Sequence, residues 1–383
     1  MAMVAGEASG DLLAGLLLAP LRQRVAGLST YGIGGPRMIA EGFRADWPID
    51  KLAVRGYFEV LRHYREISGI RQELKRRLLA DPPAAFVGID APDFNLDLEV
   101  ELRTAWRGQH RPVVHFIGPS IWAWRGKRIA KIARAVDHIL VVFPFEEEIY
   151  RKAGIAATYV GHPLADVIPL KPDRAAARIA LNLPVDVRVV ALLPGSRLSE
   201  IGYMAEPFVD AAALLHRRDP AVRFVVPMSS GPARAAFEAI RARRHADLPL
   251  QIVDGQSHAV LAAADAVLVA SGTATLETAL SKRPMVIAYK VNALTAVLMR
   301  RMGYIPWVGL PNILARAFVV PEFLQEAATP QALADAVWFQ LVDDANRARL
   351  EERFAAMHET LRRDTGTRAA AVIADLLGPQ GAR

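Results

Sequence analysis

Residues 266–277 read AVLVASGTATLE, and this stretch decides the fold that the sequence predicts. The apolar run 266–270 has the length and composition of a buried parallel strand. A Ser-Gly-Thr turn follows, then a helical pattern that ends before Pro284, then a second apolar run, PMVIAY. Strand, tight turn, helix and strand make one βαβ unit, so the sequence predicts a parallel α/β sheet here.

The turn within this unit is a candidate anion site. It lies at the carboxyl end of a strand and the amino end of a helix, where free N–H groups and the helix dipole favour negative charge. Ser271 and Thr273 add hydroxyls, and Gly272 permits close backbone approach. Glu277, one helical turn beyond Thr273, suits a ribose diol. An ordinary helix start with an acidic residue fits the same letters, and this stretch alone slightly favours that simpler interpretation.

Composition narrows the class of protein. The chain has 383 residues, 52% of them hydrophobic, a mean hydropathy of +0.18 and a net charge of +7. This length predicts two or three domains, and no apolar run approaches the ~20 residues that span a bilayer. The start does not read as a signal peptide. The absence of cysteine excludes disulfides and thiolate chemistry and fits a reducing cytoplasm. The basic balance favours anionic partners.

Strand and helix patterns alternate twice along the chain, once on each side of a proline-containing linker near residues 168–174. We therefore predict two Rossmann-like, doubly wound α/β domains, 1–167 and 168–340, facing each other across a cleft that would hold the site. The helices of residues 341–383 are expected to pack back on the first domain or on a partner subunit.

Two loops of the first half carry candidate polar residues. In GEASGD, Glu7, Ser9 and Asp11 could bind hydroxyls, although Ser9 or Asp11 could equally cap the helix that follows. Asp90 and Asp93 follow the apolar run AFVGI, where catalytic residues of α/β folds commonly lie, but Asp is also an ordinary turn former. His115 and His162 are further possible bases, and lone histidines of this kind are more often structural.

The second half contains another candidate phosphate loop, PGSR. Gly195 and Ser196 offer backbone and hydroxyl donors after the strand VVALL, and Arg197 supplies a charged fork. Two such loops in one Rossmann-like half suggest a diphosphate held between them. With Glu277 for a diol, the ligand is a nucleoside diphosphate, expected to carry a sugar. No Walker A motif is present, which disfavours nucleotide hydrolysis.

Two basic stretches have more than one interpretation. Residues 48–79 are amphipathic, with apolar Val54, Tyr57, Phe58, Leu61 and Tyr64 and basic Arg62, Arg65, Arg71, Lys75, Arg76 and Arg77. They suit a membrane surface, but the pattern alone favours a core helix with a solvated face. A second cluster comprises Arg125, Lys127, Arg128, Lys131 and Arg134, beside Trp122 and Trp124. Such a cluster can bind nucleic acid, yet no nucleic-acid-binding signature accompanies it.

An ordered set of motifs resembles the lipid-A-disaccharide synthase family. The motifs are GEASGD, GIDAPDFN, GPSIWAWR, PFE, GHPLAD, LLPGSR, ASGTATLE, LPNILA and VPEFLQ, and they run from residue 4 to about residue 326. The resemblance implies a GT-B-type fold and an inverting transfer that needs neither metal nor cofactor. The donor would be UDP-2,3-diacylglucosamine, and the acceptor would be 2,3-diacylglucosamine 1-phosphate. The product would be the β-1,6-linked disaccharide of lipid A.

The resemblance also implies roles for single residues. Asp90 would be the general base for the acceptor 6-hydroxyl, with Asp93 as runner-up, and Arg197 would neutralise charge on the leaving diphosphate. The donor side would comprise Gly195, Ser196, Ser271, Gly272, Thr273, Glu277, Asn312 and Gln325. The acceptor side would comprise Glu7, Ser9, Asp11 and Asp93.

The same resemblance implies a cytoplasmic protein that attaches peripherally to the anionic inner membrane, forms a homodimer and binds no nucleic acid. It makes the membrane-surface interpretation of residues 48–79 the better one, because acylated substrates reside in the bilayer. Two alternatives stay open. One is a UDP-N-acetylglucosamine 2-epimerase-like enzyme, which needs no acyl pocket. The other is a basic, non-enzymatic protein that binds membranes or nucleic acid.

Overall fold

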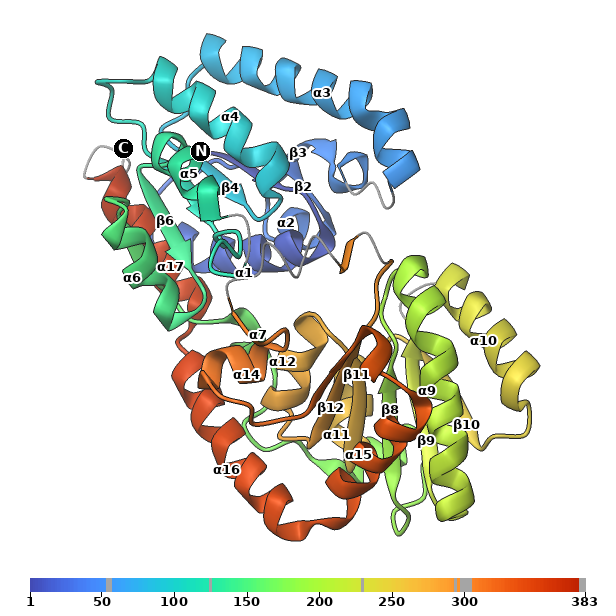
Figure 1. The fold of residues 1–383 in the computed structure, drawn as a ribbon. Coiled ribbons are helices and arrows are strands. Elements are labelled where there is room, and N and C mark those ends of the chain that lie inside the picture. Colours follow the sequence, from blue (N-terminus) through green and yellow to red (C-terminus); the bar gives the residue numbers. More distant parts are fainter. Residues whose placement is uncertain (53–56, 124–125, 229–230, 293–294, 297–304, 379–383) are drawn as a thin grey trace. The chain divides into compact units, whose positions relative to one another are not determined.

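The structure is a computed structural model that describes the chain apart from residues 53–56, 124–125, 229–230, 293–294, 297–304 and 379–383 (Figure 1). The side chains of residues 8 and 57–64 also lie outside the described part. The chain forms two compact units. Unit 1 consists of Met1–Asp166 and a C-terminal segment that begins at Leu361, and unit 2 is Val167–Thr360.

Unit 1 is built on a seven-stranded parallel sheet with the order β3-β2-β1-β4-β5-β6-β7. The strands are β1 Ala2–Ala5, β2 Tyr31–Gly34, β3 Arg44–Pro48, β4 Phe86–Ile89, β5 Val113–Phe116, β6 His138–Val141 and β7 Ala157–Tyr159. The central strands β1, β4 and β5 are buried along their whole length, as expected for strands with helices on both faces.

Helices cover both faces of this sheet. They are α1 Ala8–Arg24, α2 Pro36–Ala40, α3 Tyr57–Ala80, α4 Pro92–Ala105, α5 Ile129–Ala135, α6 Pro144–Lys152, α7 Pro163–Val167 and α17 Thr365–Leu377, with short 3₁₀ turns at Ile49–Lys51 and Gly126–Arg128. Apolar residues of α3 and α4 form one core with β1, β2, β4 and β5. Helix α17, from the end of the chain, packs along α1 (Figure 1).

Unit 2 repeats the plan with a six-stranded parallel sheet, in the order β10-β9-β8-β11-β12-β13. The strands are β8 Val189–Leu193, β9 Arg223–Met228, β10 Leu250–Asp254, β11 Ala266–Ala270, β12 Met285–Tyr289 and β13 Glu322–Leu324. The run 266–270 is a fully buried strand with β8 and β12 as its neighbours, which confirms the βαβ unit predicted from it.

Two separate cores hold the helices of unit 2 to its sheet. The helices are α8 Arg174–Ala180, α9 Leu198–Arg218, α10 Gly231–His245, α11 Ser257–Ala263, α12 Thr273–Leu280, α14 Leu310–Ala315, α15 Pro330–Val342 and α16 Asp344–Leu361, with a 3₁₀ turn at Gln325–Ala327. One core joins α9, α10 and α15 to the sheet, and the other joins α11, α12 and α16 to its opposite face. The prediction of two doubly wound parallel α/β units is thus confirmed.

The end of the chain divides between the units. Helix α16 places Leu350 and Phe354 in a core of unit 2, so it stays with that unit. Only α17 joins unit 1. The expected C-terminal segment, 341–383, therefore does not act as one element, because the apolar residues of its first helix have their partners in unit 2.

Strand order decides where each unit can bind a ligand. In unit 1 the chain runs outward from β1 to β3 and then returns to β4 on the other side of β1. In unit 2 it does the same from β8 to β10 and then to β11. In open α/β sheets the crevice at this reversal, outside the carboxyl ends of the strands, is the usual ligand site. The loops after β1, β4, β8 and β11 are therefore the ones of interest.

Candidate active site

Asp90 lies directly after β4, at the reversal point of unit 1, in an unusual backbone conformation. Asp90 and Ala91 both have positive φ, 50° and 43°, which costs about 1 kcal/mol or more for each such residue. The surrounding chain holds this turn in place. The Asp90 N–H donates to the Phe116 carbonyl at 2.9 Å, and the buried Asn95 Nδ2 donates to the Asp90 carbonyl at 2.8 Å. Backbone strain held by its neighbours is typical of a functional residue.

The carboxyl group of Asp90 is partly withdrawn from water, which changes its pKa. Burial raises the pKa of Asp90, whereas a charge on His115 and a hydrogen bond from the Ala91 backbone act to lower it. A carboxylate that is partly withdrawn from water and has a raised pKa is a better proton acceptor than an exposed one. The geometry therefore fits the role of general base that was expected for Asp90.

Glu7, in the loop after β1, and Ser9, in the first turn of α1, lie beside the turn that carries Asp90. The register pairs Ala5 with Ile89, so the loops that follow β1 and β4 begin side by side. Glu7 precedes α1 without capping it through its side chain, and both Glu7 and Ser9 are exposed. Both side chains are thus available at the same edge of the sheet as Asp90.

Asp11 has a different task from the one expected. It is only 3% exposed, and its two carboxylate oxygens accept hydrogen bonds from the N–H groups of Gly35, Arg37 and Met38, each at 3.0 Å. Asp11 therefore caps α2, a helix from another segment, and its oxygens are engaged within the protein. This corrects the prediction that Asp11 contacts the acceptor.

Asp93, the runner-up base, is an exposed member of an acidic row on α4. It pairs with Arg128, while Asp97 pairs with Lys131 and with Arg71. Further along the row Glu101 pairs with Lys75 at 3.2 Å. Carboxylates of α4 therefore pair with two residues of the basic cluster at 125–134, Arg128 and Lys131, and with two of α3, Arg71 and Lys75, which weakens the nucleic-acid interpretation. Trp124 and Arg125 lie outside the described residues.

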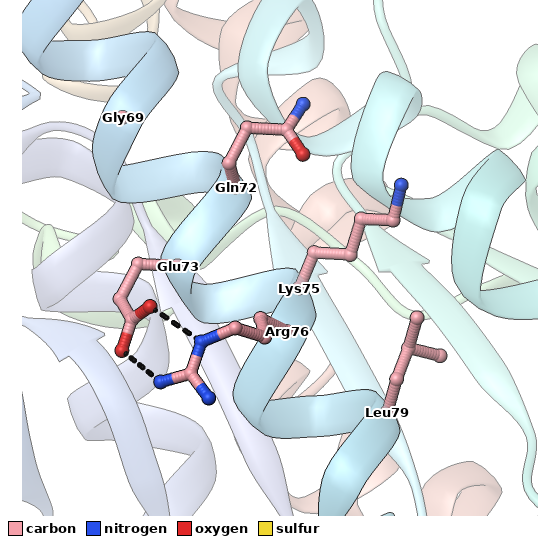
Figure 2. A pocket seen from close by; sticks show the side chains of 6 residues that line it. All are labelled: Gly69, Gln72, Glu73, Lys75, Arg76 and Leu79. Atoms are coloured by element: carbon pink, nitrogen blue, oxygen red, sulfur yellow. Dashed lines mark hydrogen bonds and ion pairs between the residues drawn. The ribbon is translucent and has the colours of Figure 1, made fainter.

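A shallow groove along α3 is lined by Gly69, Gln72, Glu73, Lys75, Arg76 and Leu79 (Figure 2). Glu73 accepts hydrogen bonds from Arg76 and Arg77 at 2.7 and 2.8 Å, and these pairs hold the pKa of Glu73 at about 2. Every residue of this groove comes from one helix, away from the strand ends, so it is not the catalytic site. Val54 and the other apolar residues expected to face a membrane lie outside the described side chains.

His162, the other possible base, is partly buried. Its Nδ1 accepts the Leu164 N–H at 3.2 Å, and burial lowers its pKa to about 4. A histidine that stays neutral and hydrogen-bonds its own loop has a structural role.

In unit 2 the PGSR loop follows β8 at the reversal point. Its backbone N–H groups already bind a carboxylate of the protein itself. Glu200 Oε2 accepts the N–H groups of Ser196 at 2.9 Å and Arg197 at 3.2 Å. Gly195 has a φ of 120°, and a Cβ there would lie 2.5 Å from the Glu200 Cβ, so glycine lets the carboxylate fold under the loop. The Arg197 side chain remains 69% exposed. The loop therefore binds a carboxylate in the way expected for phosphate, and the exposed Arg197 side chain pairs with the same carboxylate at 3.6 Å.

The Ser-Gly-Thr turn lies beside this loop, because the register pairs Val269 of β11 with Leu193 of β8. Gly272 and Thr273 are exposed at the start of α12, with helix N–H groups pointing outward. Ser271 differs from the expectation: its hydroxyl donates to the Val308 carbonyl at 3.0 Å. It braces the turn in this structure and does not offer its proton to a ligand.

Glu277 points from α12 to a residue that sequence reasoning missed. His258, from α11, lies with Nε2 3.2 Å from Glu277 Oε1, and this contact raises the pKa of His258. Glu277 keeps 20% of its side chain exposed and can still accept hydrogen bonds. Tyr289, at the end of β12, is a second residue that sequence reasoning missed. It lies near Glu200, and burial and the charge of Glu200 raise the pKa of Tyr289. Neither residue belongs to a motif, so only the fold reveals them.

Asn312 and Gln325 form hydrogen bonds to neighbouring backbone groups of unit 2. Asn312 is fully buried, accepts the N–H groups of Val319 and Val320, and donates to Glu322 Oε1 at 2.8 Å. Glu322 in turn accepts the N–H groups of Val308 and Gly309, the segment that Ser271 contacts. Asn312 therefore positions this segment rather than touching the donor, which corrects the expected contact.

Gln325 has a φ of 52° and places its side-chain amide against the backbone of Val291. Like Asn312, it is engaged with the protein itself. Among the described residues, no three His, Asp or Glu side chains gather as ligands for a metal ion. None of the described helices is long and apolar enough to cross a membrane.

A family model described as lipid-A-disaccharide synthetase matches residues 1–373. The chain is 58% identical to the lipid-A-disaccharide synthase of Cupriavidus pinatubonensis, over 100% of this chain and 94% of that protein. It is 56% identical to the lipid-A-disaccharide synthase of Paraburkholderia phymatum, over 98% of this chain and 96% of that protein.

Solved structures share the fold at low identity. One is UDP-GlcNAc 2-epimerase from Neisseria meningitidis bound to UDP-GlcNAc, with a TM-score of 0.58 and 11% identity over 94% of this chain and 98% of that one. Another is the glycotransferase of kitacinnamycin, with a TM-score of 0.60 and 16% identity over 98% of both chains.

Proposed function

Because the chain belongs to the lipid-A-disaccharide synthase family, we propose that it transfers diacylglucosamine from UDP-2,3-diacylglucosamine to 2,3-diacylglucosamine 1-phosphate. The products are UDP and the β-1,6-linked disaccharide 1-phosphate. The observation that carries the residue assignment is Asp90, a partly buried carboxyl group in a strained turn at the reversal point of unit 1.

The UDP moiety binds at the reversal point of unit 2. The N–H groups at Gly272 and Thr273 and the side chain of Arg197 offer donors to the diphosphate. Glu277, held by His258, accepts hydrogen bonds from the ribose diol. As UDP departs, negative charge grows on its β-phosphate, and Arg197 stabilises that charge.

Asp90 accepts the proton of the acceptor 6-hydroxyl while the oxygen of that hydroxyl attacks the anomeric carbon of the donor. The bond from that carbon to the β-phosphate oxygen breaks at the same time, and its electron pair leaves with UDP. Attack opposite the leaving group inverts the anomeric centre. Glu7 and Ser9, at the neighbouring strand end, bind acceptor hydroxyls.

The direct test mixes the protein with both acylated substrates, with and without EDTA, and measures UDP and disaccharide. We expect both products in a 1:1 ratio, and the same rate with EDTA. Asp90→Asn is expected to lower kcat by about 10²–10⁴-fold, the usual contribution of a general base, with UDP affinity unchanged.

Asp93→Asn is the matched control, because Asp93 lies three residues further along on an exposed position. It is expected to keep activity within a few-fold of the unsubstituted protein. If Asp93→Asn abolishes turnover and Asp90→Asn does not, the base is Asp93. If neither product forms with the unsubstituted protein, the assignment of the reaction is wrong.

The epimerase-like alternative is not favoured. Relatives at 56–58% identity are named lipid-A-disaccharide synthase, whereas the likeness to the epimerase, at 11% identity, is one of fold. Dependence of turnover on the acyl chains separates the two, because an epimerase acts on a soluble nucleotide sugar.

Acylated substrates also require the protein to work at a bilayer, so we propose peripheral attachment to the anionic inner-membrane surface from the cytoplasmic side. The exposed guanidinium groups of Arg76 and Arg77 on α3 support this proposal. Sedimentation with anionic, but not zwitterionic, vesicles would support it. The expected homodimer stays a prediction, and the molar mass in solution checks it.

A further inference from the structure

A buried pair of titratable groups lies beneath Asp90. His115 in β5 and Glu99 in α4 are both wholly inaccessible to solvent, and His115 Nδ1 lies 2.7 Å from Glu99 Oε1. Burying a charged pair costs more desolvation free energy than its attraction usually returns, so such a pair is weak evidence for stability. Its presence in the centre of a sheet calls for another explanation.

The chain makes room for this pair at one position. Gly88 of β4 is the register partner of His115 in the neighbouring strand. A Cβ at residue 88 would lie 2.0 Å from Glu99 Oε1, so any side chain there would displace the carboxylate. Glycine within a central strand weakens the strand, and here it admits a carboxylate beside the imidazole.

The orientation of the imidazole directs its second nitrogen elsewhere. With Nδ1 engaged by Glu99, Nε2 is left buried, and within the described part of the chain it has no hydrogen-bond partner. A second charged group acts on the ring: Asp90, two residues beyond Gly88, interacts electrostatically with His115. The backbone shows the same proximity, because the Asp90 N–H donates at 2.9 Å to the carbonyl of Phe116, the residue after His115. The imidazole thus has one carboxyl group bound to it from α4 and a second one in the turn after the neighbouring strand.

We propose that Glu99 and His115 are a positioning pair for Asp90. Glu99 keeps the imidazole protonated, and the imidazolium keeps Asp90 ionised so that it can accept the proton of the acceptor hydroxyl. This inference rests on the proposed function. Neither residue is assigned contact with substrate. The proton moves from the hydroxyl to Asp90 and from there to solvent, and His115 retains its own proton throughout.

The electrostatics of the site agree with this arrangement. Burial acts to lower the pKa of His115, but the charges of Glu99 and Asp90 and a backbone hydrogen bond at Ile117 raise it overall. In return, the charge on His115 opposes the rise that burial causes in the pKa of Asp90. The titratable residue of the next strand, β6, is His138, which contacts the Thr158 hydroxyl at 2.8 Å and is not among the groups that act on His115.

The sign of the pH effect follows. Asp90 works as a base only when ionised, so kcat/KM falls as pH drops through its pKa. Loss of the imidazolium removes the group that lowers this pKa. In His115→Gln the acidic limb of the kcat/KM profile should therefore move to higher pH by about one to three units, the usual effect of one nearby charge. At alkaline pH, where Asp90 ionises without help, the rate should approach that of the unsubstituted protein.

The experiment measures full pH profiles of the unsubstituted protein, His115→Gln, Glu99→Gln and the control His138→Gln. We expect both pair variants to shift the acidic limb upward with recovery at high pH, and the control not to shift it. A merely structural role would lower the rate equally at every pH. A pair variant with a lowered but unshifted profile overturns the proposal.

A second measurement covers variants that fail to fold. Nitrogen NMR of histidine-labelled protein follows the imidazoles in the unsubstituted chain and in Asp90→Asn. We expect one imidazole besides that of His258 to keep its proton to a higher pH than an ordinary histidine, and to titrate at lower pH in Asp90→Asn. His258, which lies in unit 2, should not move. No such imidazole means that the pair is wrong, even if disaccharide forms. Absence of disaccharide with that imidazole present means instead that the proposed reaction is wrong.

Discussion

Asp11 shows how a charged residue becomes part of a framework. It lies near the start of α1, where its letters fit a helix cap or a ligand contact, and the sequence does not tell which N–H groups will reach it. The structure brings the start of α2 to its side chain, and both carboxylate oxygens are then engaged. A contact between segments more than 20 residues apart depends on strand order, which local pattern does not encode.

We predict that Asp11→Ala lowers the free energy of unfolding by about 2–3 kcal/mol, because buried N–H groups would lose a charged acceptor. Urea denaturation followed by circular dichroism measures this loss. Ser9→Ala, on an exposed position of the same helix, should change it by no more than about 0.5 kcal/mol. A loss of acceptor affinity at unchanged stability would return Asp11 to the acceptor site.

Glu200 places a negative charge where a diphosphate is expected. Glu200→Gln keeps an oxygen that can accept the N–H groups of Ser196 and Arg197, but it removes the charge that would repel the ligand. UDP affinity should rise about fivefold, equivalent to roughly 1 kcal/mol. Isothermal titration calorimetry measures the Kd. Glu206→Gln, further along α9 and paired with Arg243 and Arg244, should leave it unchanged. Weaker binding of UDP by Glu200→Gln would contradict the repulsion.

At the scale of elements, the central strands could be predicted, and two of the edge strands, β3 and β13, could not. The runs 189–193 and 266–270 are buried at every position, so they appear in the sequence as unbroken apolar stretches. The edge strands β3, RADWP, and β13, EFL, are only partly buried and carry charged residues. Solvent on one side removes the requirement for apolar side chains, and the pattern that identifies a strand disappears with it.

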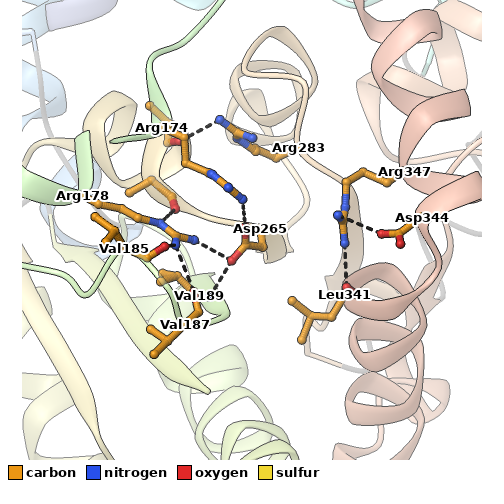
Figure 3. Close-up of polar contacts among 12 residues, drawn as sticks. Arg174, Arg178, Val185, Val187, Val189, Asp265, Arg283, Leu341, Asp344 and Arg347 are labelled. Atoms are coloured by element: carbon orange, nitrogen blue, oxygen red, sulfur yellow. Dashed lines mark hydrogen bonds and ion pairs between the residues drawn. The ribbon is translucent and has the colours of Figure 1, made fainter. Parts of the chain in front are cut away.

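Asp265 fixes the amino ends of β8 and β11, at the opposite ends of these strands from the candidate phosphate loops. Figure 3 shows its contacts. Its carboxylate accepts the Val189 N–H at 2.8 Å and pairs at 2.6 Å with both Arg174 and Arg178. Arg178 is almost wholly buried and also donates to three backbone carbonyls. This cluster attaches α8 to the base of the sheet.

Asp265→Ala should lower the free energy of unfolding by about 3–5 kcal/mol, because it leaves the buried Arg178 charge without its partner. Chemical denaturation monitored over unit 2 by hydrogen exchange measures the loss. Asp335→Ala removes the exposed partner of Arg218 and should cost less than about 1 kcal/mol. Equal effects of the two substitutions would show that Arg178 finds another partner.

For the whole molecule, repetition of one plan made the positions of the candidate loops predictable. Asp90, the PGSR loop and the Ser-Gly-Thr turn all follow apolar runs, and parallel strands bring their carboxyl ends to one edge of each sheet. The residues that hold these loops in place were not predictable. Asn312 and Ser271 belong to motifs, but only the fold shows that they contact Glu322 and Val308. Motifs reveal which residues matter more readily than which ones touch a ligand.

Unit 1 depends on the far end of the chain. Asp166 accepts the N–H groups of Asp364 and Thr365, and a Cβ on Gly366 would lie 2.3 Å from the Leu16 carbonyl, so α17 lies close against α1. A chain that ends at Arg363 should lose exchange protection in unit 1 and keep it in unit 2. A chain that ends at Gly378 retains α17 and is the control. Loss of protection in both units would show that their stabilities are linked.

The same arrangement sets an order of events during synthesis. The ribosome synthesises unit 2 before it synthesises α17. Unit 1 therefore still lacks α17 when unit 2 emerges. Domains usually fold from the N-terminus as they emerge, but here the first unit is completed last. The side of α1 that α17 covers therefore stays exposed to the cell until residues 365–377 have been made. A nascent chain stalled before Thr365 should offer chaperones a surface that the finished protein has hidden.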